Sequence, residues 1–410
     1  MPRLNGCVRI ACRFRSKVSA VRLSFRRAAG ILFIGLLIEA AFVAGLLLAP
    51  TLLPVSPLRL GSNPTGLFGE AWDAAERSFY GQVPSDTVRT YGAIRGMIQA
   101  YNDPYTNFFE PPATQQQSQQ LAGKFGGIGS TVRRETDGRI VLSPFPDQPA
   151  AKAGVQDGDV LAKVDAHTIT SDMTFDAISQ LLRGEVGTQV SIEVTRTTQS
   201  LAFTITRAEI SVPSVTWRVL SEAPTIGYVA ISIFAQPTGD ELVRAIEDVQ
   251  SKGATQLILD LRDNGGGLLD SAVAVASQFV DGVVVIEARR TGGDRNFNAN
   301  STGAARNLPL VILVNGNTAS ASEIVAGAIQ DRQRGKLIGD QTYGKGSVQN
   351  ILPLSDGSSL HVTVAQWLTP DRRQITGKGL TPDVIVGRTP EDVTAGRDPQ
   401  LAKAVEELTR

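Results

Sequence analysis

Short apolar runs alternate with helix-like segments between about residues 226 and 388, and this alternation constrains the fold more than any other feature of the chain. The runs are "IGYVAIS", "QLILDLR", "VVVIEAR" and "LVILVN", and "ELVRAIEDVQSKG" and "LLDSAVAVASQFV" separate the early ones. Strands that alternate with helices favour a largely parallel sheet. "SLHVTVAQWLTP" adds a strand, and "DPQLAKAVEELT" is typical of a closing helix. We therefore expect an α/β core over residues 210–390 and a C-terminal helix within residues 391–410.

Two further regions precede this core. Residues 62–120 space their apolar residues three and four apart, as in "GLFGEAWDAAERSFY", which predicts a mainly helical region. Residues 125–209 contain "QVSIEVTR" and "LAFTITRAEI", whose alternation predicts an antiparallel hairpin, and an Asp137-Gly138 turn between two short strands. A chain of 410 residues is long enough for several domains. We expect a multidomain protein of mixed α+β and α/β class.

The N-terminal part of the chain predicts a membrane anchor. Residues 1–30 contain eight basic residues and no acidic one, and the apolar run over residues 31–53 has Glu39 as its single charge. At about 1.5 Å per residue, a helix of this length spans a hydrocarbon core of about 30 Å. The basic flank then favours a cytoplasmic N-terminus and an exported remainder. The alternative is a cleaved signal peptide, although its apolar region is usually only about 7–15 residues long.

Composition excludes several classes of site. Lys and Arg total 40 and Asp and Glu total 40, so no basic surface for nucleic acid is expected. Both cysteines, Cys7 and Cys12, lie in the predicted cytoplasmic segment. The exported part therefore has no thiol for a disulfide, a zinc cluster or a nucleophile. We expect neither a metal nor a cofactor.

The segment "NGNTASASEIVAGAIQD" places the hydroxyls of Thr318, Ser320 and Ser322 at the start of a predicted helix. One interpretation is a capping box, with Ser320 as N-cap and Glu323 three residues later. The other is a nucleophile, because Ser320 would follow a strand at the carboxyl edge of an α/β sheet, where such folds build sites. Backbone N–H groups at a helix N-terminus also favour a developing anion.

A serine nucleophile needs a base, and the chain offers few. His167 lies near a turn and His361 in an alternating strand, and no second signal supports a Ser-His-Asp arrangement. Lys345 lies between Gly344 and Gly346, where the backbone can approach another group closely. A buried lysine loses pKa and can act as a base in a Ser-Lys pair, whereas in a solvated loop it stays charged.

The glycine run in "DLRDNGGGLLD" follows a predicted strand and opens a predicted helix. It lacks the Gly-Lys-Ser/Thr ending of a P-loop and the spacing of a dinucleotide fingerprint. Either it is a tight connection, or its exposed N–H groups form an oxyanion hole.

Taken together, these motifs resemble the carboxy-terminal processing protease family, also called tail-specific proteases, over about residues 66–386. The resemblance is carried by "TASASEIVAGAIQD" followed by "GDQTYGKGSVQ", and by "YGAIRGMIQAYNDPYTNFF", "GKFGGIGS" and "GKGLTPDV". It implies a PDZ domain over residues 125–209 and a ClpP- and crotonase-like α/β protease core. It further implies a nucleophile at Ser320, a general base at Lys345, a supporting glutamine at Gln349, an acidic supporting residue at Asp331, and oxyanion donors in the amides of Gly266 and Ala321. Thr318 stands where serine is more usual in the family.

The resemblance also implies how substrates are captured. A PDZ domain binds an extended peptide by strand addition and holds the terminal carboxylate on backbone N–H groups. The carboxylate loop would be Gly126, Gly127, Ile128 and Gly129. In regulated members an arginine of an R-G-x-x-G motif links the PDZ domain to the active site, and "RGEVG" assigns that role to Arg183. The alternative for Arg183 is a helix C-terminal cation beside a capping Gly184.

These expectations describe a single-pass membrane protein whose catalytic part, in the periplasm or outside the cell, is a serine endopeptidase. Its partners would be protein or peptide substrates with exposed C-termini, the membrane, and an adaptor protein or a second copy of the chain. One alternative is a non-catalytic scaffold that retains the shape of the active site. Another is a tricorn-like or retinoid-binding relative of the same fold.

Overall fold

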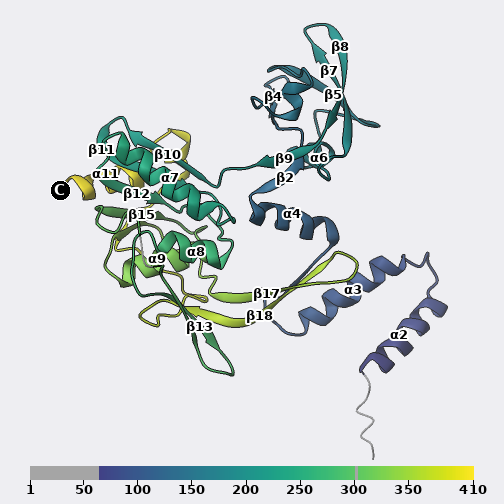
Figure 1. Ribbon diagram of the computed structural model, residues 1–410. Coiled ribbons are helices and arrows are strands. Elements are labelled where there is room, and N and C mark those ends of the chain that lie inside the picture. The colour runs from purple at the N-terminus through teal and green to yellow at the C-terminus, as the bar shows by residue number, and fades with distance from the viewer. Residues whose placement is uncertain (1–63, 301–302) are drawn as a thin grey trace, which may run out of the picture. The chain divides into compact units, whose positions relative to one another are not determined.

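A computed structural model describes residues 64–300 and 303–410 of the protein (Figure 1). The chain divides into two compact units, Met1–Ser85 and Asp86–Arg410. Of the first, the structure describes helix α2 (Pro64–Ser78). The predicted cytoplasmic segment and the anchor over residues 31–53 lie outside the described residues. Within the described ranges, no helix combines the length and apolarity needed to cross a bilayer.

The predicted parallel sheet is confirmed. Six strands line up in the order β10, β11, β12, β15, β16 and β19, and every neighbouring pair from β11 to β19 is parallel, while β10 pairs antiparallel with β11. The strands are β10 (Val215–Leu220), β11 (Ala223–Ile231), β12 (Gln256–Asp260), β15 (Leu310–Val314), β16 (Lys336–Gly339) and β19 (Val384–Ile385).

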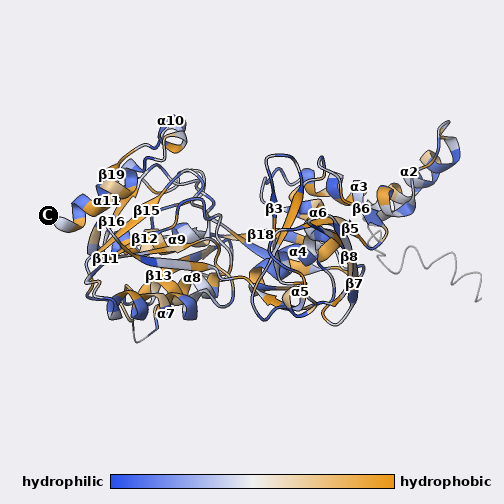
Figure 2. Ribbon diagram, turned by 90° about the horizontal axis from the view of Figure 1, so that it is seen from above, coloured by the Kyte–Doolittle hydropathy of each residue, from blue (hydrophilic) through white to orange (hydrophobic). Residues whose placement is uncertain are grey.

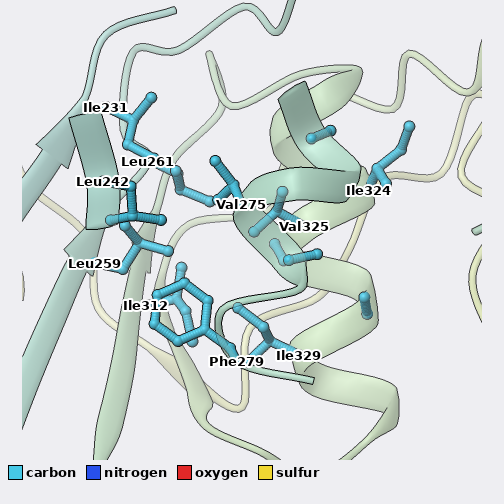
Figure 3. Close-up of a cluster of buried hydrophobic side chains, with 14 of the residues drawn as sticks. Ile231, Leu242, Leu259, Leu261, Val275, Phe279, Ile312, Ile324, Val325 and Ile329 are labelled. Carbon is cyan, nitrogen blue, oxygen red and sulfur yellow. The ribbon is translucent and has the colours of Figure 1, made fainter. Parts of the chain in front are cut away.

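Helices cover both faces of this sheet. The side chains of Leu257 and Leu259 belong to one buried cluster, shared with helices α7 (Thr238–Ser251), α8 (Leu269–Ala276) and α9 (Ala321–Asp331). Figure 3 shows Leu259 and Ile312 of the sheet facing Phe279, Val325 and Ile329. Ile258, between the two leucines, belongs to a second cluster with helix α11 (Pro399–Thr409). Burial of each Leu, Ile or Phe side chain contributes about 1.5–3 kcal/mol to the free energy of folding, so both helical layers stabilise the sheet.

One apolar run does not join the parallel sheet. "VVVIEAR" forms β13 (Val283–Arg289), which belongs to an antiparallel sheet with β1, β14, β17 and β18. The expectation that this run contributes a strand to the parallel sheet is therefore wrong. The reason is local: Gly292 and Gly293 adopt positive φ and turn the chain back into a hairpin with β14. The other strands are β1 (Asn107–Phe109), β14 (Arg295–Asn298), β17 (Ser347–Pro353) and β18 (Ser359–Leu368).

Residues 124–211 form a separate small β-rich module with its own core of thirteen buried side chains, all between Ile128 and Ile205. The predicted Asp137-Gly138 turn and the predicted hairpin are both confirmed, as β3–β4 and β7–β8. The main sheet has the order β3, β4, β5, β7 and β8, with β6 beside β5, and β2 pairs with β9. The elements are β2 (Lys124–Gly127), β3 (Ser130–Arg134), β4 (Ile140–Pro144), α5 (Pro149–Lys152), β5 (Asp159–Val164), β6 (His167–Thr168), α6 (Phe175–Leu182), β7 (Gln189–Arg196), β8 (Gln199–Thr206) and β9 (Ala208–Ser211).

Three further helices complete the described elements: α3 (Asp86–Gln99), α4 (Pro111–Ala122) and α10 (Pro390–Thr394). Helix α4 leads into β2, and its end is capped by Gly123 in the left-handed conformation. Figure 2 colours strand β15 as hydrophobic, whereas α7 shows both colours. This is the pattern expected for a strand buried on both faces and a helix buried on one.

Candidate active site

A cavity of about 760 Å³ lies where the parallel and antiparallel sheets meet, beside the N-terminus of α9. Its wall is formed by the glycine turn after β12, the start of α9, and residues of β13, β17 and β18. The lining residues include five of the six that sequence reasoning assigned to the catalytic centre: Gly266, Ser320, Ala321, Lys345 and Gln349. The sixth, Asp331, is not among them.

The three hydroxyls at the start of α9 differ in their partners and exposure. Thr318 is fully buried, and its Oγ1 donates to the carbonyl of Leu261 at 2.8 Å. Ser322 is also fully buried, and its Oγ donates to the carbonyl of Asn264 at 2.8 Å. Both hydroxyls therefore hold the start of α9 against the loop after β12. Ser320 alone among the three lines the cavity, so it is the one hydroxyl placed to meet a substrate.

Ser320 has an unusual backbone conformation, with φ 56° and ψ −115°. A non-glycine residue in this region is strained, and such strain concentrates at functional sites. Ser320 is also the N-cap of α9, and its N–H donates to the Glu323 carboxylate at 2.9 Å. The capping interpretation therefore describes the backbone of this residue, which does not conflict with a chemical role for its side chain.

Gly266 lies directly against this strained serine. A Cβ at Gly266 would be 2.8 Å from the Ser320 Cβ and 2.9 Å from the Ala321 nitrogen, and its φ is +104°. Only glycine fits such a close approach. Gly267, with φ +146°, is equally constrained because a Cβ there would lie 2.2 Å from the Phe234 carbonyl oxygen.

The two predicted oxyanion donors differ in this structure. Among the described residues, no acceptor takes the N–H of Ala321, the first residue of α9. The N–H of Gly266 instead donates to the side-chain oxygen of Asn264 at 2.9 Å. Asn264 is fully buried, and its Nδ2 donates to the carbonyl of Ile231 at 2.8 Å. One donor is thus free and the other is engaged by a neighbouring side chain.

Lys345 is half-buried, and burial lowers the pKa of its amine. Its Nζ lies 5.8 Å from the centre of the Tyr105 ring. The flanking glycines are required by packing, because a Cβ at Gly344 would lie 2.9 Å from the Gly379 nitrogen and one at Gly346 would lie 2.5 Å from the Thr376 nitrogen. The loop therefore presses against residues 375–379 and carries the amine into the cavity.

Gln349 and His361 line the same cavity as Lys345. The Nε2 of Gln349 donates to the carbonyl of Tyr105. His361 is buried, its ring centre lies 4.4 Å from that of Phe109, and its Nε2 is 3.3 Å from the Ser359 hydroxyl. Burial and the nearby charge of Lys345 both lower the pKa of His361. His167 is exposed on β6 in the small module and does not line the cavity.

Tyr105 is a component of the site that sequence reasoning did not single out. Its ring faces the Lys345 amine and its carbonyl oxygen holds Gln349. The segment "NDPYTNFF" belongs to the motifs that carry the resemblance, but nothing local in it places its tyrosine near the predicted dyad, which lies far away in the chain. The turn is fixed by Asp103, whose carboxylate accepts from the Thr106 hydroxyl at 2.6 Å.

Asp331 does not lie with these residues. It is the last residue of α9, whereas Ser320 precedes the first. Its carboxylate accepts from the N–H of Asp371 at 2.8 Å and from the Nε of Arg373 at 2.8 Å. The structure thus gives Asp331 a role in fixing the turn after β18. Over residues 64–300 and 303–410, His, Cys, Asp and Glu side chains form no group of three able to hold a metal ion.

Comparison with known proteins assigns the chain to a family. The model of peptidase family S41 matches residues 225–386. A carboxy-terminal-processing protease from Bartonella bacilliformis is 35% identical over 377 residues, covering 88% of this chain and 86% of that protein. This chain belongs to peptidase family S41. It is accordingly a serine peptidase.

Other relatives of this S41 peptidase carry similar names. A carboxyl-terminal-processing protease from Synechocystis sp. is 34% identical over 330 residues, covering 78% of this chain and 77% of that protein. A solved structure of a photosystem II D1 C-terminal processing protease shares 33% identity at a TM-score of 0.45, covering 78% of this chain and 92% of that chain.

The PDZ domain model matches residues 126–206 of this S41 peptidase. Strand β3, which follows the glycine run, is an edge strand paired with β4. In the described part of the chain, the N–H groups of Ile128 and Gly129 have no acceptor, whereas their carbonyls accept from Ala150 and Phe145. Gly126 must be glycine because a Cβ there would lie 2.0 Å from the Gly184 carbonyl oxygen. The module thus offers unpaired N–H groups next to a free strand edge.

Arg183 of this peptidase is the C-cap residue of α6, and its guanidinium lies 4.2 Å from the centre of the Phe125 ring. It lines a groove against α4 with Gln120, a residue that also lines the active-site cavity. Gly184 does not adopt the left-handed conformation of a capping glycine, and its N–H donates to the Gly126 carbonyl at 3.1 Å. The part of the alternative interpretation that made Gly184 a left-handed cap is therefore wrong, because the Gly184 N–H bonds to the Gly126 carbonyl of β2.

Proposed function

We propose that this peptidase cleaves peptide bonds with a dyad of Ser320 and Lys345. The observation that carries the proposal is the shared cavity: Ser320 is the one hydroxyl of its segment that lines it, and Lys345 brings into it an amine whose pKa is lowered by burial. A lysine base must be neutral to accept a proton, and desolvation favours the neutral form.

The reaction follows from these positions. The Ser320 hydroxyl attacks the substrate carbonyl carbon while its proton passes to the neutral amine of Lys345. The C–N bond then breaks as the protonated Lys345 gives this proton to the leaving amine. Water then attacks the acyl carbon and gives a proton to Lys345. The C–O bond to Ser320 breaks as Lys345 returns this proton to the serine oxygen, which releases the new carboxyl terminus and restores both residues. Gln349, held by the Tyr105 carbonyl, supports the lysine from the same wall.

The amides of Ala321 and Gly266 bind the oxyanion in this mechanism. The N–H of Ala321 is free for this purpose, whereas that of Gly266 must leave the Asn264 side chain or share its hydrogen atom with the oxyanion. A single donor of this kind is worth about 10²–10³-fold in kcat. The hydrogen bond from the Gly266 N–H to Asn264 is therefore consistent with a resting state in which the site is less active.

The PDZ domain selects the substrate by its C-terminus. An extended tail would pair with the free edge of β3, and its carboxylate would bind to the N–H groups of Ile128 and Gly129, next to Gly126 and Gly127. The names of the Bartonella and Synechocystis relatives, which are carboxyl-terminal processing proteases, support this assignment.

The N-terminal sequence supports anchoring of the enzyme to the cell membrane by residues 31–53, with the catalytic part on the extracytoplasmic side. Residues 1–30 would then remain in the cytoplasm. An adaptor or a second copy of the chain remains a candidate partner in this arrangement. Protease protection of the intact protein in sealed membrane vesicles tests this topology: the catalytic part should resist digestion in inverted vesicles and be digested in right-side-out ones.

Mass spectrometry of the products from a denatured protein substrate tests the catalytic proposal. Wild type should produce new termini, and Ser320→Ala and Lys345→Ala should each abolish them while retaining the fold. Cleavage by a folded Lys345→Ala variant at the wild-type rate would exclude the dyad. Absence of cleavage by the wild type under all substrate conditions would favour the scaffold alternative.

A further inference from the structure

One buried carboxylate joins the loop of the proposed nucleophile to the loop of the proposed base. Glu323 is fully buried in the first turn of α9, and four donors surround it. Its Oε2 accepts from the N–H of Ser320 at 2.9 Å and from the N–H of Lys345 at 2.9 Å. Its Oε1 accepts from the N–H of Gly344 at 2.7 Å and from the hydroxyl of Thr342 at 2.6 Å.

This arrangement exceeds what a helix cap requires. A capping glutamate uses one hydrogen bond, from the N-cap N–H, and leaves its other oxygen for solvent. Here only the bond from Ser320 is of that kind, and the other three come from residues 342–345, which belong to another segment. Thr342 extends the network, because its Oγ1 accepts from the N–H of Leu380 at 2.7 Å.

The same oxygen atom thus fixes the backbones of Ser320 and Lys345. Both donors are N–H groups of the very residues whose side chains line the cavity. Burial raises the pKa of Glu323, while the four donated hydrogen bonds favour its anion. A buried group with four donors has no equivalent substitute, because losing it leaves those donors unsatisfied at a cost of about 1–3 kcal/mol each.

We propose that Glu323 is a positioning residue that sets the distance between the Ser320 hydroxyl and the Lys345 amine. The proposal rests on the Ser320–Lys345 dyad of the preceding subsection. It assigns to Glu323 the fine alignment of two segments that a backbone hydrogen bond from the Tyr343 N–H to the Thr318 carbonyl, at 3.0 Å, also joins. A misplacement of about 1 Å in such a pair costs about 10²-fold in rate.

Glu323→Gln separates this role from capping. Glutamine is as good as glutamate at the third position of a capping box, so a role in capping alone predicts a nearly normal enzyme. In the bridge that residue 323 forms between Ser320 and residues 342–345, however, glutamine offers one oxygen acceptor. Its NH₂ group must face N–H or hydroxyl donors. The positioning role therefore predicts a kcat reduced about 10²-fold with KM unchanged, because the PDZ domain and the substrate contacts remain.

Glu241→Gln is the matched control. Glu241 lies in the first turn of α7, and its Oε2 accepts from the N–H and the hydroxyl of Ser214 at 2.8 and 2.6 Å and from the N–H of Val215 at 3.2 Å. It joins a helix to another segment by the same chemistry, but it does not line the cavity. Its substitution should lower the melting temperature as Glu323→Gln does and leave kcat close to wild type.

The experiment compares wild type, Glu323→Gln and Glu241→Gln by melting temperature, by kcat and KM on a denatured protein substrate, and by the rate at which a fluorophosphonate labels Ser320. A slow labelling rate and low kcat in Glu323→Gln alone supports the bridge. Wild-type labelling and kcat in Glu323→Gln, or an equal kcat loss in Glu241→Gln, overturns it. If wild type is labelled at a residue other than Ser320, the dyad itself fails, and that outcome is distinct.

Thr342→Val provides a second variant in case Glu323→Gln does not fold. It removes one donor from Oε1 without altering Ser320, Lys345 or the charge of Glu323. We expect a smaller loss of kcat, about tenfold, with KM unchanged. A folded Thr342→Val enzyme with wild-type kcat and labelling rate contradicts the proposal.

Discussion

The active-site cavity and the proposed peptide-binding part of the PDZ domain, which comprises the loop 126–129 and the edge of β3, are built in opposite ways. In the cavity, the backbone N–H groups of Ser320 and Lys345 are engaged by one buried carboxylate that binds four donors, and glycines lie within contact distance of other backbone atoms. In the peptide-binding part of the PDZ domain, the N–H groups of Ile128 and Gly129 and the outer edge of β3 have no partner in the described structure. Catalysis needs fixed positions, whereas capture of a peptide tail needs unpaired groups, and the same chain supplies both.

The largest effect is expected at the glycine that touches the nucleophile. Gly266→Ala would place a methyl group 2.8 Å from the Ser320 Cβ at a φ of +104°, so the turn must move away from the oxyanion position. We expect kcat to fall about 10²–10³-fold with little change in peptide-tail binding by the PDZ domain. Steady-state kinetics and a tail-peptide binding assay on the same preparation measure both. Equal losses of kcat and tail binding would remove the distinction between the two regions.

The next largest effect is expected in the pH dependence of kcat/KM. The protonated amine of Lys345 is inactive as a base, so kcat/KM should be lost as pH falls through its lowered pKa, by about tenfold per pH unit below it. The affinity of the PDZ domain for a peptide tail should not follow this profile. His361→Gln is the control variant, because the His361 pKa is also lowered and its ring lines the same cavity. Loss of the profile in His361→Gln would make histidine the base.

A substitution in the proposed carboxylate loop, residues 126–129, should impair substrate binding and leave the chemical step intact, which is the reverse of Gly266→Ala. Gly129 has φ +70°, and a Cβ there would lie 2.4 Å from the Cβ of Gln148, so Gly129→Ala displaces the loop that carries the free N–H groups. We expect KM for a tail-bearing substrate to rise about tenfold, which is about 1.4 kcal/mol, while kcat on a short peptide without a tail stays normal. Gly158→Ala, at a positive φ with open space around it, controls for backbone strain alone. An unchanged KM in Gly129→Ala would place the carboxylate elsewhere.

Sequence reasoning was most successful where a pattern is local. The parallel strands, the β3–β4 and β7–β8 hairpins and the closing helix follow from periodicity, and the S41 motifs selected residues that share one cavity. The catalytic roles of those residues stay predictions. Positions that depend on partners far away in the chain could not be predicted in this way. Strand β13 pairs with β18 in the antiparallel sheet, and the N–H of Gly184 donates to a carbonyl of β2. The Asp331 carboxylate accepts from a backbone N–H in the turn after β18.

Two features of the site itself could not be predicted from the sequence, each for its own reason. The contact of Tyr105 with Lys345 joins segments far apart in the chain, and its strength depends on packing that no short motif encodes. The engagement of the Gly266 N–H by Asn264 is a local turn, but whether this N–H is free is a matter of conformation rather than of residue type.

The smallest effect concerns the element between the two regions. Arg183 stacks on Phe125 and shares a groove with α4, whose Gln120 reaches the active-site cavity. Arg183→Lys keeps the charge but loses the planar stacking, and we expect a few-fold decrease of kcat on a tail-bearing substrate and no change on a short peptide without a tail. Kinetics on the two substrates measure the ratio. An identical decrease on both would mean that Arg183 acts on the fold and not on coupling.

The most direct test of the account is to find which atom a serine-directed reagent modifies and how fast. Wild type treated with a fluorophosphonate should carry the label on Ser320, and Lys345→Met, which keeps the apolar stem and removes the amine, should be labelled far more slowly at an unchanged melting temperature. Labelling of Thr318 or Ser322, or a Lys345→Met variant labelled at the wild-type rate, would contradict the claim that a neutral lysine activates this serine.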